Sequence, residues 1–236
     1  MVETIPLEHF NVNSHKRFAE LVSNAQQFDA FRRALRQRLV PIRARFDPPP
    51  PFDPSFPRYV HGVAFAFGNG PVRWVTAGPL VENADQVECR NEDGDWYRVE
   101  VRLPCPGAEL ATLEHVLTAE NPDRKDKDPI GIQLGLSAAN SKEVRAYLPI
   151  LALTNLEGTS SVLDVGRVDG ILREADSTAW ISNLKLPPGT PLVNVDGAVL
   201  LVRVVRGTRS YELPPSSLDS CPDKSTNENK PPPSDP

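Results

Sequence analysis

The sequence has little of several features that would place it quickly in a functional class. Its 236 residues include only three cysteines (Cys89, Cys105 and Cys221) and four histidines, none at spacings typical of a metal site. No apolar run approaches the roughly 18–20 residues of a membrane-spanning helix. The first ten residues lack a basic stretch followed by an apolar core, so no secretory signal is visible. We therefore expect no metal or other cofactor, no membrane span, and a reducing cytoplasmic setting with free thiols. A Cys89–Cys105 pair is the alternative.

Nucleic-acid binding is also disfavoured by what is missing. The formal net charge is −5, and no basic patch interleaved with aromatic residues occurs after residue 45. No glycine-rich phosphate-binding loop is present, because the Gly68-Asn69-Gly70 sequence is typical of a hairpin turn. We expect the partners of this chain to be proteins, and self-association into an oligomer stays open.

Proline, by contrast, is abundant. It accounts for 25 residues, about twice its usual frequency, while the hydrophobic share of 39% is typical of a folded protein. Six of the twelve residues from Phe46 to Pro57 are proline, which excludes a regular helix or a central strand there. We assign residues 46–58 to an extended connector and residues 214–236, rich in Pro, Ser, Asp and Asn, to a disordered tail.

Residues 1–45 are predicted to form an N-terminal helical segment. Apolar side chains recur at steps of three and four from Phe18 to Leu39, after a cap at Asn13 or Ser14 and with a break near Asn24. Between residues 14 and 45, eight basic and two acidic side chains give a local net charge of +6. The helix either packs on the acidic remainder of the chain or docks onto another protein, an anionic surface being the least favoured interpretation. The candidate contact residues are Phe18, Phe28, Phe31 and Leu35.

From residue 59 onward the pattern changes to short runs rich in Val, Ile, Leu and aromatic residues, separated by turn signals. This pattern is typical of an all-β sandwich or barrel and not of alternating strands and helices. The predicted strands cover residues 60–67, 73–76, 86–90, 96–103, 109–115, 130–135, 146–153, 162–171, 179–181 and 198–205.

Three motifs in this region resemble, in order and spacing, those of the trypsin-like serine proteases of the HtrA/Deg type. Residues 76–81 (TAGPLV) are similar to the family's TAAHVV, in which the histidine is the general base. Residues 109–113 (ELATL) are similar to the motif whose aspartate orients that histidine. Residues 186–193 (LPPGTPLV) are similar to GNSGGPLV, which carries the nucleophilic serine.

The resemblance covers about residues 59–205 and implies a fold. We expect two antiparallel six-stranded β-barrels over residues 59–213, divided near the charged run at residues 121–128. In such proteases the cleft between the barrels binds extended peptide by strand addition to the second barrel. The corresponding edge here is placed at residues 164–171, with residues 180–183 beside it and Trp180 as a further candidate for partner contact.

The departures from the motifs fall on the residues that carry out the chemistry. Pro79 occupies the position of the base, Glu109 that of the orienting aspartate, and Pro188 that of the nucleophile. Proline has no titratable group and no backbone N–H, so Pro188 removes a hydroxyl and one oxyanion donor together. Leu186 replaces the glycine whose N–H is the other donor. The sequence therefore predicts a catalytically inactive pseudoprotease that works as a protein-binding, scaffolding or regulatory module.

Two alternatives remain. In the first, the chain is an active hydrolase in which Thr190 or Ser182 is the nucleophile and uses a borrowed base. No histidine lies near residue 79, and His61 and His115 fall at predicted strand ends, where we interpret them as surface or barrel-end residues. In the second, it is a structural subunit of an assembly in which the barrels are a rigid body and the N-terminal helix makes the contacts.

Overall fold

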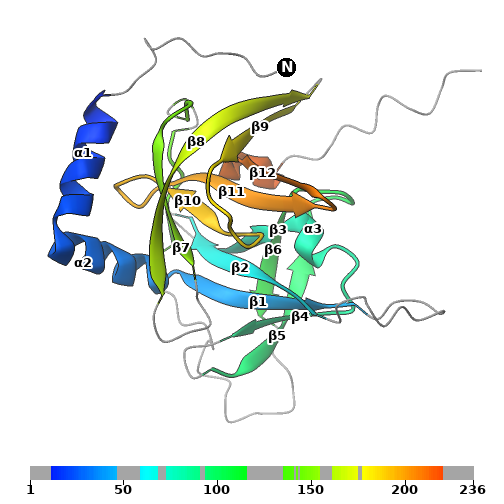
Figure 1. Cartoon of the computed structure of the whole chain (residues 1–236). Helices are drawn as coiled ribbons and strands as arrows, with labels where there is room; N and C mark the ends of the chain where they lie inside the picture. Colours follow the sequence, from blue (N-terminus) through cyan, green and yellow to red (C-terminus); the bar gives the residue numbers. More distant parts are fainter. Residues whose placement is uncertain are drawn as a thin grey trace, which may run out of the picture.

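The computed structural model describes residues 12–46, 59–68, 73–90, 94–115, 135–140, 142, 144–154, 161–174 and 177–219. The described chain is mostly strand, with a helix pair at its N-terminal end (Figure 1). Its elements are α1 (Val12–Ser23), α2 (Ala25–Arg36), β1 (Leu39–Arg45), β2 (Tyr59–Phe67), β3 (Arg73–Ala77), α3 (Gly78–Val81), β4 (Gln86–Arg90), β5 (Trp96–Arg102), β6 (Leu110–His115), β7 (Pro149–Thr154), β8 (Val162–Glu174), β9 (Ser177–Ser182), β10 (Pro191–Val193), β11 (Val199–Arg206), β12 (Arg209–Leu213) and the 3₁₀ helix η4 (Pro215–Asp219).

The strands form two closed antiparallel barrels of six strands each, which confirms the predicted fold class. The order around the first barrel is β1-β2-β3-β6-β5-β4, and around the second it is β10-β11-β12-β9-β8-β7. The division between the barrels therefore lies between His115 and Pro149. The charged run at residues 121–128 and residues 130–134 of a predicted strand lie outside the described residues. Beyond them, Leu136 donates to Ala66 of the first barrel and Ser137 accepts from Val199 of the second.

The first strand lies where the sequence predicts the end of the helix. Leu35 and Leu39 are four residues apart and fit a helical stripe, but α2 ends at Arg36 and β1 begins at Leu39. Pro41 is tolerated in β1 because pairing with β4 begins only at Ile42. The barrel domain thus starts at Leu39 and not at residue 59. The proline-rich residues 47–58, which lie outside the described residues, connect two neighbouring strands of the first barrel.

The helix pair covers the outer side of the second barrel. The break predicted near Asn24 is present: the Asn24 side chain caps α2 by accepting from the Gln27 N–H (3.1 Å). Strand β7 is buried on both faces, because Ile150 and Ala152 point into the second barrel while Leu151 and Leu153 belong to the larger core against which the helices pack. The expected packing of this helical segment on the chain's own body is therefore observed. Within the described ranges, none of the helices has the length and apolar character that crossing a membrane requires.

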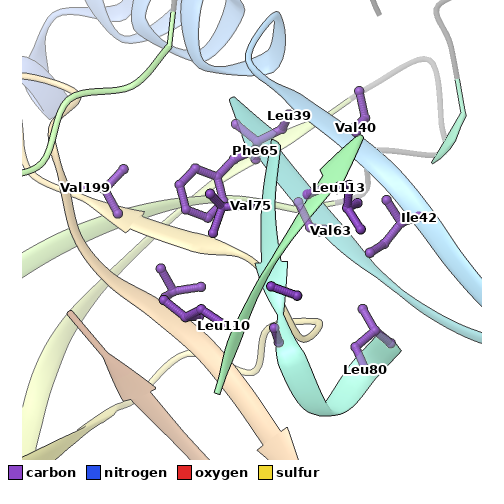
Figure 2. Close-up of a cluster of buried hydrophobic side chains, with 14 of the residues drawn as sticks. Leu39, Val40, Ile42, Val63, Phe65, Val75, Leu80, Leu110, Leu113 and Val199 are labelled. Atoms are coloured by element: carbon purple, nitrogen blue, oxygen red, sulfur yellow. The ribbon is translucent and has the colours of Figure 1, made fainter. Parts of the chain in front are cut away.

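Two hydrophobic cores hold the molecule together. The larger core fills the first barrel and continues into the second (Figure 2). Phe65, fully buried on β2, lies among side chains of β1 and β3, with Val199 of the second barrel beside it. Leu80 reaches this core from α3. The smaller core occupies the interior of the second barrel.

The C-terminal boundary predicted at residue 214 is wrong. Residues Pro215–Asp219 form η4, and Leu218 is only 6% exposed within the larger core. One apolar residue among Pro, Ser and Asp gives little sequence signal, but its burial is enough to dock the segment. Residues 220–236 lie outside the described residues.

The cysteines also differ from the expectation of three free thiols. Cys89 is free and fully buried, and burial raises the pKa of its thiol to about 12. Cys105 is disulfide-bonded, so it does not pair with Cys89.

Candidate functional site

The first two motifs meet at the short helix α3. Pro79 lies in its first turn, where a backbone N–H has no helical partner and proline is accommodated. The preceding Gly78 donates its N–H to the Glu109 carbonyl (2.7 Å), and a Cβ at this position would lie 1.9 Å from the Ala108 carbonyl oxygen. A glycine at residue 78 therefore allows the first motif to pack directly on the second.

The third motif is fixed between the two barrels. The Pro188 carbonyl accepts from the Val63 N–H (2.9 Å) of the first barrel, and the Gly189 N–H donates to the Arg203 carbonyl (2.8 Å) of the second. Gly189 has φ +83°, and a Cβ on it would lie 2.0 Å from the Val63 carbonyl oxygen. Contacts with both barrels therefore constrain the backbone of the loop at Pro188 and Gly189.

Gly62 brings the first and third motifs together. A Cβ on Gly62 would lie 2.3 Å from Leu80 Cδ2 and 2.7 Å from the Pro188 carbonyl oxygen. All three motifs thus converge where the barrels meet, as their resemblance to protease motifs implies. The convergence point holds two prolines, which supply neither a proton acceptor nor a backbone N–H.

The Glu109 side chain contacts two residues of the second barrel. Its Oε2 accepts from the Tyr211 hydroxyl (2.8 Å), and its Oε1 lies 3.5 Å from Nε of Arg206. Arg206 also lies 3.8 Å from a Glu82 oxygen, and it donates to the Gly107 carbonyl (3.1 Å). Burial, followed by the Glu109 carboxylate, raises the pKa of Tyr211 to about 12. The side chain at the orienting position therefore joins the two barrels.

The Leu186 side chain packs in the core of the second barrel. It is 8% exposed and belongs to the core of the second barrel, together with Ile150, Leu192 and Leu201. Trp180 packs half-buried against the same core. A glycine at the position of Leu186 would remove a core side chain, so this departure is tied to the stability of the barrel.

The displaced nucleophiles considered from the sequence are both buried and hydrogen-bonded. Thr190 is fully buried and donates to the Pro187 carbonyl (2.8 Å). Ser182 is 8% exposed and donates to Glu212 Oε1 (2.8 Å). His61 lies against Trp96, with ring centroids 6.4 Å apart, and since successive residues of a strand alternate faces it points away from the side that Gly62 presents to Pro188. The His115 side chain lies outside the described part of the structure.

Directly behind the third motif lies a charged pair that the sequence did not reveal. Glu212 is fully buried and accepts a hydrogen bond from Arg203. Burial raises the pKa of Glu212, opposed by Arg203 and by the Ser182 hydrogen bond. The backbone of Arg203 also donates to the Thr190 carbonyl (3.0 Å), so the pair is coupled to the loop that carries Pro188. The sequence offered one signal, Arg203 within the apolar run of β11, because β12 has no comparable apolar run.

The candidate partner-binding side chains of the helix pair face the chain's own core. Leu35 is 3% exposed, and Phe18, Phe28 and Phe31 are partly buried against the larger core. Polar contacts reinforce this packing: Arg17 pairs with Asp196, and Arg32 donates to Ser161 Oγ (3.0 Å).

The strand edge proposed for peptide addition is an inner strand of a closed barrel. Residues 164–167 pair with β7, and residues 168–171 pair with β9 across a register shift. Each half of β8 is thus paired along one side only, although the barrel as a whole is closed. Peptide addition at residues 164–171 therefore stays a prediction.

One surface cavity of the described structure lies away from the point where the three motifs converge. A surface cavity of about 380 Å³ lies on the first barrel, lined by residues 84–87 and 98–101, and none of Pro79, Glu109, Leu186 and Pro188 lines it. Across the described ranges, no group of three or more His, Cys, Asp or Glu side chains is placed to hold a metal ion.

Comparison with known proteins gives a result for structure only. No protein-family model and no curated protein matches the sequence. The HtrA-type protease AlgW, solved with a decapeptide, aligns with a TM-score of 0.52 at 15% identity, over 79% of this chain and 64% of that chain. The chain has the fold of the HtrA-type proteases. A variant of AlgW solved with a tripeptide aligns with a TM-score of 0.54 at 13% identity, over 79% of this chain and 60% of that chain. The chain thus matches less than two thirds of the length of either HtrA-type structure.

Proposed function

We propose that this chain is a non-catalytic pseudoprotease that acts as a protein-binding, scaffolding or regulatory module. The proposal rests on the residues found at the four positions where the motifs differ from those of an active protease. Pro79 and Pro188 offer no group for proton transfer or nucleophilic attack, Glu109 bonds to Tyr211, and Leu186 fills the second core. Acyl transfer on this fold needs a nucleophile, a base and two oxyanion donors at one place.

The distribution of exposed apolar side chains supports the protein-binding half of the proposal. Of the seven large hydrophobic residues exposed in the described part, five belong to β8, β9 or the turn before β7. Exposed large apolar side chains are candidate contacts for another protein. These residues are Tyr147, Val162, Val165, Leu172 and Ile181. The matched HtrA-type structures contain peptides, and we infer peptide or protein ligands for this chain as well.

Two measurements on the full chain test the proposal. The first treats the protein with a fluorophosphonate probe for serine hydrolases and with peptide esters, with an intact-triad HtrA-type protease assayed in parallel. We expect neither labelling nor turnover by this chain. Turnover that disappears in Thr190→Val or Ser182→Ala would instead establish an unrecognised hydrolase.

The second measurement addresses the surface. Partners are captured by the wild type and by variants that place a charge on exposed sites, Val165→Asp on β8 and Val22→Asp on α1 as the matched control. We expect Val165→Asp to lose partners that Val22→Asp keeps. Loss only with Val22→Asp would favour the assembly-subunit alternative, in which the helix pair makes the contacts.

A further inference from the structure

The outer face of the first barrel carries a cluster of polar and aromatic side chains around Arg43. The Arg43 side chain projects from β1, and its Nε donates to Glu88 Oε2 of β4 (2.6 Å). Its guanidinium carbon lies 4.8 Å from the ring centroid of Tyr59 on β2 and 4.3 Å from that of Trp96 on β5. Four neighbouring strands thus contribute one side chain each to this Arg43 cluster.

These contacts hold the guanidinium of Arg43 but leave its outer end without a partner. In the described part of the chain, Arg43 forms hydrogen bonds only through Nε, and its side chain is 25% exposed. The two Nη atoms carry the other N–H donors of the guanidinium, in a planar fork that matches the two oxygens of a carboxylate. We propose that Arg43 binds a carboxylate in an acidic segment of a partner protein.

The cluster prepares Arg43 for such a contact before a ligand arrives. A mobile arginine side chain loses rotamer entropy when it forms a bidentate contact, and this loss weakens binding. The guanidinium of Arg43 is already fixed by the Glu88 carboxylate and by the rings of Tyr59 and Trp96. The entropy cost of fixing this side chain is therefore met by folding and does not reduce the affinity for a ligand.

The charge of the surrounding face favours an anionic ligand. Ile42 and Cys89 are fully buried, so alternate residues of their strands, such as Arg43, face outward. The outward positions of β1, β4 and β5 hold five arginines and two glutamates, and the guanidinium of Arg90 lies 5.8 Å from the Trp96 ring centroid. This face is thus basic on a chain whose net charge is −5, and it attracts acidic segments. No single stretch of sequence reveals it, because its arginines come from three strands.

Carboxylates of a protein fit this face better than a nucleic acid does. Single-stranded nucleic acids bind by stacking bases on aromatic rings. Here the ring of Tyr59 already contacts the guanidinium of Arg43, and the ring of Trp96 contacts those of both Arg43 and Arg90. The two outward glutamates also repel a continuous phosphate backbone, whereas a single carboxylate can approach Arg43 alone. The site is separate from the exposed apolar side chains of β8 and β9, and it does not depend on the absence of catalysis.

Binding of a labelled acidic peptide to the full chain tests the proposal. The probe is a fluorescein-labelled peptide of alternating glutamate and glycine, followed by fluorescence anisotropy, and a peptide with glutamine in place of glutamate is the ligand control. We expect only the glutamate peptide to bind. Arg43→Lys keeps the charge but loses the planar fork, and it should raise the Kd by roughly 10-fold or more. Arg33→Lys on the exposed face of α2 is the matched control and should leave the Kd unchanged.

Three results of this titration would overturn the proposal. The first is a wild type that binds neither peptide or binds both equally. The second is an Arg43→Lys variant with the wild-type Kd, since a lysine would then serve as well as the fork. The third is tighter binding of an oligothymidylate than of the glutamate peptide, which would assign the face to nucleic acid. Circular dichroism of Arg43→Lys shows whether a loss of binding comes from the site or from unfolding.

Tryptophan fluorescence locates the peptide without a change at Arg43. Because Trp96 contacts Arg43, the glutamate peptide should alter the tryptophan emission of the wild type. Trp96→Phe keeps a ring beside the guanidinium, so it should still bind the labelled peptide but lose the change in emission. Trp180→Phe in the second barrel is the control and should retain that change. An emission change that persists in Trp96→Phe would place the peptide elsewhere and refute the site, while the proposed function, tested by hydrolase probes and by Val165→Asp, would be unaffected.

Discussion

Glu109 and Leu186 occupy two of the four positions at which the motifs differ from those of an active protease, and both have defined partners. The Glu109 carboxylate accepts a hydrogen bond from Tyr211 of the second barrel. Leu186 is buried in the core of that barrel. Changing either residue towards a catalytic one therefore removes a contact of the present fold, so activity and stability are expected to conflict at this place.

Replacing only the triad should not produce catalysis. The variant Pro79→His, Glu109→Asp, Pro188→Ser gains three side chains and one backbone N–H. Pro187 restricts Leu186 to extended conformations, and the Leu186 side chain is buried, so we expect its N–H to point away from the oxyanion position. The loss of one such donor costs on the order of 10²–10³ in rate. We expect peptide-ester hydrolysis by this triple variant to stay at the background rate.

The further changes Leu186→Gly and Pro187→Asn are the minimum additional repair. Leu186→Gly should itself cost about 2–5 kcal/mol of stability, so circular dichroism must establish that the repaired variant is folded. Measurable turnover by the triple variant alone would show that the loop already has an active conformation.

Tyr211 should make stability sensitive to alkaline pH. Its folded-state pKa of about 12 exceeds the value of about 10 in an unfolded chain, so the folded state retains the proton longer. The stabilisation is fully present below about pH 10 and is lost as the pH rises towards 12. Urea unfolding at several pH values should therefore show a shallower alkaline decline for Tyr211→Phe than for the wild type. The exposed Tyr59 provides the control, and a Tyr59→Phe variant with the same shallow decline would refute the assignment.

The Arg203–Glu212 pair should respond differently to single and double replacement. Glu212→Leu leaves a largely buried guanidinium without its carboxylate, and we expect a loss of about 3–5 kcal/mol. The double variant Arg203→Met, Glu212→Leu replaces the pair by apolar groups of similar size, and its unfolding free energy should return to within about 1–2 kcal/mol of the wild type. Denaturant titration measures both. A double variant as unstable as the single one would mean that the charges themselves hold the loop.

At the residue scale, the sequence located the degenerate positions but not what they do. Motif spacing identified Pro79, Glu109 and Pro188, because the family's order of motifs is a local property of the chain. The bond from Tyr211 to Glu109 joins residues about a hundred positions apart, and nothing near either residue indicates it. The Arg203–Glu212 pair depends likewise on the register between β11 and β12.

At the scale of elements, the helix pair is part of the fold and not a free arm. Phe28 and Phe31 of α2 pack against the larger core, so aspartate at both positions places charge against apolar surface. We expect Phe28→Asp with Phe31→Asp to lower the free energy of unfolding by roughly 3 kcal/mol or more. Val22→Asp on the exposed face of α1 is the control and should change it little. Equal urea midpoints for the wild type and the double variant would contradict this packing.

The elements that the sequence predicted correctly are those with a strong local period. Strands β2 to β9 and β11 were found within a few residues, since each has a clear apolar run bounded by turn residues. Strand β1 was missed because Leu39 continues a helical stripe and Pro41 suggests a break. Strand β10 has three residues, all of which were already assigned to the third motif, and β12 alternates too weakly to stand out. The short helix η4 depends on one buried leucine, which no period reveals.

At the scale of the whole molecule, the two barrels share one core. The larger hydrophobic cluster contains Phe65 and Val75 of the first barrel together with Val199 and Val202 of the second. Figure 2 shows Val199 beside Phe65. Each barrel thus covers apolar surface of the other that would otherwise be exposed to water. The inter-barrel bonds from Glu109 and from the Pro188 loop add polar contacts to the same boundary.

The shared core predicts that the barrels unfold together. Calorimetry on the full chain should give one transition whose calorimetric and van't Hoff enthalpies agree. Phe65→Ala in the first barrel and Leu201→Ala in the second each delete a fully buried side chain, at a cost of about 2–5 kcal/mol. Both variants should move that one transition down by roughly 5–15 °C without splitting it. Two separate transitions, with each variant moving only one of them, would mean that the barrels are independent and that the apolar contacts at Val199 contribute little to cooperativity.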